Sequence, residues 1–132
     1  MVLIDTSIWI KVLSDKQGYY ASKLYKEIAG RDIVLTRFQQ LELLQGSRNE
    51  KEWGQLSEYL DGQDYLEMQA GAWQSAARLY FELRKTGVAV RSPIDCCIAQ
   101  IAMDYGVLLI HNDRDFDAIG KNFPLQHLRW TQ

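Results

Sequence analysis

The chain has no long hydrophobic run and few cysteines. Nothing in its 132 residues approaches the roughly 18 consecutive apolar residues of a membrane-spanning helix, so we expect no membrane segment. The opening Val2-Leu3-Ile4 lacks the basic flank and the length of a signal peptide. The two cysteines, Cys96 and Cys97, are adjacent, a spacing that suits neither a disulfide framework nor a zinc site. We therefore expect a cytoplasmic protein whose cysteines are reduced core residues.

The chain also lacks the basic excess of a typical nucleic-acid-binding protein. It has 15 Lys and Arg against 17 Asp and Glu, a formal net charge of −2, whereas nucleic-acid binding favours a basic face. Clustering of the acids would make this sum misleading. Removing five candidate site carboxylates from −2 leaves +3, and a bound divalent ion adds positive charge at the same place. The net charge therefore neither predicts nor excludes a nucleic-acid substrate.

No Gly/Ser linker, low-complexity tract or internal repeat divides the sequence. Its length fits one domain, and the 47% hydrophobic and 24% charged contents are those of an ordinary globular protein. We therefore predict a single domain over residues 1–132.

Short apolar runs alternate with segments of helical periodicity. We predict strands at 2–4, 33–36, 107–110 and 125–130, with 65–68 as a weaker candidate. Gly30, Gly46 and Gly106 are placed to end helices, and Ser92-Pro93 to begin one. Thr6 or Ser7 is a candidate cap for the first helix. The alternation predicts an α/β fold, a three-layer α/β/α sandwich around a mostly parallel sheet of about five strands.

Carboxylates follow two of the predicted strands. Asp5 comes directly after residues 2–4, and Asp113 comes shortly after residues 107–110. Strands that run the same way in a parallel sheet end on the same edge, so we expect these two acids to be neighbours. Clustered carboxylates repel one another, and a hard divalent cation is the usual reason that a fold tolerates them. The sequence therefore predicts a metal site at this edge.

Glu42 and Asp95 also flank predicted strand ends or helix starts. Taken singly, each acid has a structural explanation: Asp5 as a cap, Asp95 as a favourable first-turn charge, Asp113 as a loop residue and Glu42 as a surface position. Only the ordered set favours chemistry. Mg²⁺ or Mn²⁺, as one or two ions, prefers such oxygen ligands, offsets the charge of a phosphodiester and activates a water for attack.

The ordered set resembles the PIN-domain nucleases, especially the VapC-type ribonuclease toxins. The resemblance rests on four segments: Val2-Leu3-Ile4-Asp5-Thr6-Ser7, Leu41-Glu42-Leu43-Leu44-Gln45-Gly46, residues 93–102 and Asn112-Asp113-Arg114-Asp115-Phe116. Cys96-Cys97 departs from the small or aliphatic residues more usual after the third acid, which affects packing and leaves the acids intact.

The resemblance implies a set of catalytic acids: Asp5, Glu42, Asp95 and Asp113, with Asp115 as a frequent fifth member. It implies Asp5, Asp95 and Asp113 as metal ligands, and leaves open whether Asp113 or Asp115 faces the metal more directly. The hydroxyl of Thr6 or Ser7 would support the first aspartate. The implied activity is a metal-dependent endoribonuclease that leaves a 5′-phosphate and a 3′-hydroxyl. The implied partners are RNA, a small antitoxin and a second copy of the chain.

Three arginines lie close in sequence to these acids and are candidates to bind substrate phosphates: Arg114, Arg37 and Arg91. Each has the alternative of a surface charge or an ion pair with a neighbouring acid. We assign His111 and His127 structural roles, because a site of acids and metal needs no histidine base. The four tryptophans fall on predicted apolar stripes, so we assign them to the core or to an interface.

Other enzyme classes fit less well. A phosphatase or dehalogenase with an aspartyl nucleophile needs a second acid where this chain has Ser7, and no Gly-rich phosphate loop is present. Two alternatives stay open: a non-catalytic scaffold of the same fold that binds RNA or protein, and a housekeeping RNA-processing nuclease.

Overall fold

The computed structural model describes residues 1–131. In chain order its elements are β1 (Val2–Ile4), α1 (Thr6–Ser14), α2 (Tyr19–Ile28), β2 (Ile33–Val34), α3 (Arg37–Gln45), α4 (Glu50–Asp61), α5 (Ala72–Lys85), α6 (Pro93–Tyr105), β3 (Leu108–His111), α7 (Arg114–Asn122) and β4 (His127–Arg129). None of these helices is long and apolar enough to cross a membrane.

The sheet has the order β2-β1-β3-β4, and every neighbouring pair is parallel. Leu3 of β1 pairs with Val34 on one side and Leu109 on the other. This confirms the predicted α/β class, with four strands in place of the five expected. Residues 65–68 give only an isolated parallel bridge between Leu35 and Tyr65, because the chain beyond Leu35 turns into α3 and offers no further partner.

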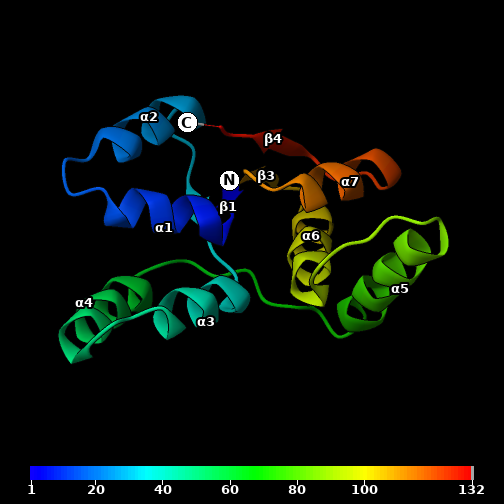
Figure 1. Ribbon diagram of the computed structural model, residues 1–132, viewed down its shortest axis with the longest axis horizontal. Helices are drawn as coiled ribbons and strands as arrows, with labels where there is room; N and C mark the ends of the chain where they lie inside the picture. Colours follow the sequence, from blue (N-terminus) through cyan, green and yellow to red (C-terminus); the bar gives the residue numbers. More distant parts are fainter. Residues whose placement is uncertain (132) are drawn as a thin grey trace.

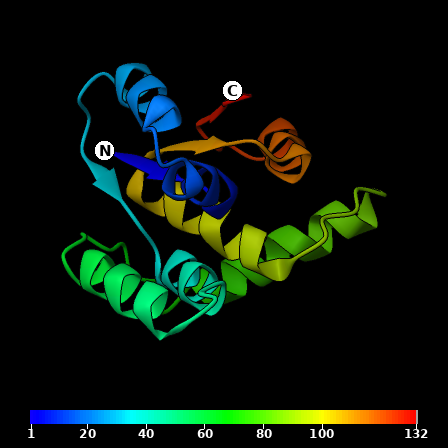
Figure 2. The ribbon, with the colours of Figure 1, turned by 60° about the vertical axis from the view of Figure 1, so that its left-hand side comes forward.

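Helices cover both faces of the sheet, as Figures 1 and 2 show. Successive side chains of a strand point to opposite faces. Leu3 therefore packs with buried residues of α5, α6 and α7, whereas Val2 and Ile4 pack with those of α1 to α4. Two apolar layers thus enclose the sheet, which gives the predicted three-layer sandwich.

Local signals set where the helices begin and end. Ser92 caps α6, Pro93 occupies its first turn, and Gly106 closes it with a φ of +64°, a backbone conformation that glycine adopts without strain. The prediction that Thr6 or Ser7 caps α1 is wrong. Asp5 is the N-cap residue, because β1 ends at Ile4 and the helix already includes Thr6.

The four tryptophans divide between the core and the surface of the chain. Trp9 and Trp130 are core residues, but Trp53 is 47% exposed and Trp73 is 56% exposed. Both exposed tryptophans lie on outer helices, α4 and α5, of which one side packs against the rest of the chain. Cys96 and Cys97 are free thiols buried in the core, as predicted.

Candidate active site

Asp5 and Asp113 meet at the carboxyl edge of the central strands. Asp5 directly follows β1, is only 7% exposed and donates its backbone N–H to the carbonyl of Ile110 on β3 at 2.9 Å. Asp113 follows β3 and caps α7 by accepting the N–H of Asp115 at 2.9 Å. Burial raises the pKa of Asp5, and repulsion from Asp113 adds to that effect. The parallel pairing of β1 and β3 therefore brings together two acids that are distant in sequence.

Asp95 enters the same place from the start of α6. The Ser92 hydroxyl accepts the N–H of Ile94 at 3.1 Å, which fixes the helix start and puts Asp95 in the first turn. Asp95, Asp113 and Asp115 each offer a carboxylate oxygen, and these three atoms lie within 4.8 Å of one another. Asp115 is 4% exposed, so this side of the group is held inside the protein.

The pKa of Asp95 records how closely the acids are grouped. It is raised from 3.8 to about 7, first by burial and then by repulsion from four other carboxylates: Asp5, Asp113, Asp115 and Glu42. A negative charge at Asp95 is thus disfavoured unless a cation offsets its neighbours. All five acids that the sequence analysis selected contribute to one electrostatic site.

Two hydroxyl groups donate hydrogen bonds to the site acids outside the group of Asp95, Asp113 and Asp115. The Ser7 hydroxyl donates to Oδ2 of Asp5 at 2.7 Å, and the Thr6 hydroxyl donates to Oε1 of Glu42 at 2.9 Å. Burial raises the pKa of both carboxyls, and these hydrogen bonds act in the opposite direction. Ser7 therefore supports the first aspartate, while Thr6 ties α1 to Glu42 on α3.

Gln39 is a supporting residue that the sequence analysis missed. Its buried side chain donates to the carbonyl of Ile4, the last residue of β1, and accepts the N–H of Thr36 at 2.8 Å. The backbone N–H of Gln39 in turn donates to the Thr36 hydroxyl at 3.4 Å, which completes a capping box. The start of α3 is thereby locked to the end of β1, and Glu42 follows within the next turn. The Thr-x-x-Gln spacing is a signal that could have identified it.

The three candidate arginines have different surroundings. Nη2 of Arg91 lies 2.9 Å from both carboxylate oxygens of Asp113, and its Nε lies 3.0 Å from Oδ2 of Asp115. Arg37 instead pairs with Glu67 at 2.8 Å and stacks 3.9 Å above the ring of Tyr65. Arg114 is the exposed first residue of α7. Arg91 is therefore the arginine that directly contacts the acids.

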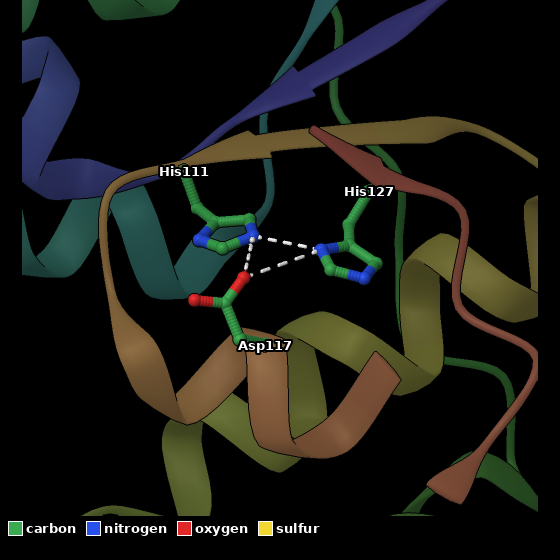
Figure 3. A group of neighbouring side chains, drawn as sticks. All are labelled: His111, Asp117 and His127. Carbon is green, nitrogen blue, oxygen red and sulfur yellow. Dashed lines mark hydrogen bonds and ion pairs between the residues drawn. The ribbon is translucent and has the colours of Figure 1, made fainter. Parts of the chain in front are cut away.

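A second polar cluster lies beside the acids, between β3, β4 and α7 (Figure 3). His111 Nε2 lies 3.0 Å from His127 Nδ1, and Oδ1 of Asp117 lies 3.7 and 3.8 Å from these two nitrogens. Asp117 also forms a close ion pair with Arg129. Burial lowers the pKa of His111 to about 4, so its imidazole is neutral. The cluster joins β3 and β4 to α7, the helix that Asp113 caps.

The tautomer of His111 shows what this cluster can do. The backbone N–H of Asp113 donates to Nδ1 of His111 at 3.1 Å, so we assign the ring proton to Nε2, which donates to His127. A metal-binding histidine has the opposite arrangement, with a bare ligating nitrogen and a donor on the other side. The cluster therefore fits a hydrogen-bond network that supports Asp113, as the structural role assigned to both histidines implies, and does not fit a metal site.

The acidic group does have the composition of a metal site. Its ligand atoms are all carboxylate oxygens, which Mg²⁺ and Mn²⁺ prefer, and their mutual repulsion shows in the raised pKa of Asp95. A cation of the protein itself, the Arg91 guanidinium, already contacts two of the three carboxylates. The residues present therefore fit a divalent metal ion.

Comparisons with known proteins agree with this geometry. A PIN domain family model matches residues 2–122. The chain is 32% identical to ribonuclease VapC11 of Mycobacterium tuberculosis over 130 residues, which is 96% of each protein. Its fold is similar to VapBC2 from Rickettsia felis, with a TM-score of 0.78, 18% identity and coverage of 99% and 100%. It is also similar to VapBC-1 from nontypeable Haemophilus influenzae, with a TM-score of 0.77, 22% identity and complete coverage of both chains. The chain therefore belongs to the PIN-domain family.

Proposed function

We propose that this protein is a metal-dependent endoribonuclease that acts as the toxin of a toxin-antitoxin pair. The observation that carries the proposal is the convergence of five carboxylates from four segments, which raises the pKa of Asp95 to about 7. The relatives named ribonuclease VapC, which are matched over nearly their whole length, give the substrate class. We further propose that residues 1–132 form one nuclease domain.

Asp5, Asp95 and Asp113 are the proposed metal ligands. A bound Mg²⁺ or Mn²⁺ would supply positive charge against the phosphodiester and lower the pKa of a water near it. Asp115 is held by Arg91 and by burial, so it orients that arginine and adds negative charge beside the metal. Glu42, held by Thr6, is placed to accept a hydrogen bond or a proton at the edge of the site.

Substrate phosphates would be bound by Arg114, Arg91 and Arg37. Arg91 has the strongest support because its guanidinium already lies at the acids, on a side chain that is 66% exposed. A guanidinium presents a planar set of donors that matches two phosphate oxygens. Arg37 has the weakest support, since its guanidinium contacts Glu67 and Tyr65 and none of the five site acids.

The proposed partners follow from the VapC relationship. We propose that a small cognate antitoxin covers the acidic site and that the toxin forms a homodimer in the cytoplasm, where its RNA substrate lies. Co-purification of a small protein with the chain from its native strain tests the antitoxin. Light scattering tests the dimer, and a monomeric mass would remove that part of the proposal.

The decisive experiment combines cleavage with mapping. Purified protein is incubated with total RNA and Mn²⁺ or Mg²⁺, and new 5′ ends are sequenced with and without chelator. The matched control is Asp95→Asn, which keeps the shape of the side chain and removes its charge. We expect metal-dependent cuts that the control reduces by at least about 100-fold, the upper range for loss of a group that supports a metal. Equal cutting by a folded Asp95→Asn protein would defeat the proposal.

A further inference from the structure

Arg91 occupies the position of a counter-ion within the acidic site. We propose that Arg91 neutralises this site while it is free of metal, and that a divalent cation displaces its guanidinium on binding. The inference rests on the proposed metal site. It adds that a side chain of the protein competes with the metal ion for the acids. It makes Arg91 a residue that sets how readily the nuclease takes up metal.

The contacts of Arg91 involve the oxygens that a metal would use. Its Nη2 is 2.9 Å from both oxygens of Asp113, and its Nε is 3.0 Å from Oδ2 of Asp115, which also accepts the backbone N–H of Arg91 at 3.3 Å. Asp113 and Asp115 are two of the three acids whose oxygens lie within 4.8 Å. One guanidinium therefore contacts two of these three acids, and one of the two, Asp113, is a proposed metal ligand.

A metal ion and this guanidinium compete for the same carboxylates. A metal bonded to Asp113 at about 2 Å needs at least one carboxylate oxygen that Nη2 now engages. The two cations would also repel each other strongly at such short range, in a partly buried site. Simultaneous occupation with the present contacts is therefore unfavourable, and the doubly charged ion has the stronger attraction for the three acids.

The structure gives Arg91 freedom to leave. Its side chain is 66% exposed, and it lies in the segment 86–92 between α5 and α6, outside regular secondary structure. Its partners are less exposed, at 21% for Asp113 and 6% for Asp115, so these acids need a cation nearby, and a bound metal ion would supply that charge when Arg91 leaves. Asp115 also accepts the backbone N–H of Arg91 at 3.3 Å, a contact that does not involve the guanidinium.

Metal binding by the protein tests the competition without any use of RNA. Titration calorimetry with Mn²⁺ compares wild type with Arg91→Ala, Arg91→Lys and a control, Arg78→Ala. Arg78 is also an exposed arginine in one ion pair, with Glu82 on α5. We expect Arg91→Ala to bind Mn²⁺ severalfold more tightly and Arg78→Ala to match wild type. Arg91→Lys should also bind more tightly, because one ammonium group cannot span both carboxylates.

Three results would overturn the inference. Unchanged or weaker Mn²⁺ binding by Arg91→Ala would mean that the arginine does not compete. Wild-type affinity in Arg91→Lys, together with tighter binding in Arg91→Ala, would assign the effect to net charge alone. Absence of Mn²⁺ binding in every variant would remove the metal site itself.

The chemical reactivity of Arg91 gives a direct reading of its displacement. Phenylglyoxal reacts with the neutral form of a guanidine, which contact with Asp115 and Asp113 disfavours by raising the pKa of Arg91, and mass spectrometry measures the rate at each arginine. We expect Arg91 to react slowly in chelator and faster with Mn²⁺, while the rate at Arg78 stays constant. An equal rate at Arg91 with and without Mn²⁺ would contradict displacement. Because RNA cleavage enters neither measurement, an inactive protein that still releases Arg91 on metal binding would refute the proposed function alone.

Discussion

The backbone N–H of Asp113 donates a hydrogen bond of 3.1 Å to the imidazole of His111. His111 is fully buried at the end of β3, and its other ring nitrogen donates to His127 on β4. The backbone of a proposed metal ligand is thus oriented by a neutral histidine that is itself oriented by the neighbouring strand. A substitution that moves His127 should therefore also affect Asp113.

Gly120→Ala tests that connection. A Cβ at position 120 would lie 2.2 Å from Nε2 of His127, so the ring must move. We expect a loss of stability of about 1–3 kcal/mol, typical of overpacking, together with weaker Mn²⁺ binding. Gly54→Ala is the matched control, because Gly54 also lies within a helix and nothing is within 4 Å of its added Cβ. The free energy of unfolding of Gly54→Ala, measured by urea denaturation, should rise by about 0.5–1 kcal/mol. Equal effects of the two substitutions would contradict this role of His127.

Asp95 makes the stability of the metal-free protein depend on pH. Its pKa is about 7 in the folded protein against 3.8 for the free group, so the folded state binds more protons between these values. The free energy of unfolding contributed by Asp95 therefore falls as the pH rises from about 4 to about 7. Asp95→Asn should remove this fall. The difference in free energy of unfolding between the variant and wild type should therefore be larger at pH 8 than at pH 5. Urea denaturation midpoints of both proteins, measured in chelator at each pH, test this prediction. A difference between the two proteins that does not change with pH would argue against the raised pKa of Asp95.

Metal affinity should have the opposite dependence on pH. Carboxylate ligands bind metal in their deprotonated form, so Asp95 must lose its proton. Since its pKa is about 7, the Mn²⁺ association constant should rise up to about tenfold per pH unit below pH 7 and level off above it. Calorimetry in buffers of different ionisation enthalpy counts the protons released. A flat profile between pH 5 and pH 8 would show that Asp95 is not a ligand.

Thr6→Val tests the support of Glu42. The substitution keeps the size of the side chain and removes the hydroxyl that donates to Glu42 at 2.9 Å. We expect cleavage to fall by about tenfold, the lower range for loss of a partner that orients a site carboxylate. Thr6→Ser retains the hydroxyl and should keep most of the activity. Similar activity in the valine and serine variants would show that this hydrogen bond is dispensable.

The proximity of Asp5 and Asp113 could be predicted from the sequence because it depends on strand direction alone. Short apolar runs identified β1 and β3, and parallel strands end on the same edge. The start of α6 could be predicted as well, because Ser92 and Pro93 are strong local signals.

Other features depend on how the elements pack, which a periodic pattern does not contain. Trp53 lies on the same face of α4 as Leu60, yet Trp53 is 47% exposed whereas Leu60 is fully buried. The contact of Arg91 with both Asp113 and Asp115 requires the path of the loop before α6, which no sequence spacing gives. The missing fifth strand has a similar cause, because the end of β2 at the start of α3 decides how far residues 65–68 can pair.

The strand order also bears on when the protein can become active during its synthesis. β1 is made first, but it lies between β2 and β3, and its residue Leu3 pairs with Leu109. A ribosome must therefore have translated β3 before Asp5 gains its neighbour on that strand. Nascent chains that stall or are degraded earlier cannot assemble the acids, so a cell making this protein would meet nuclease activity only from chains that extend past β3.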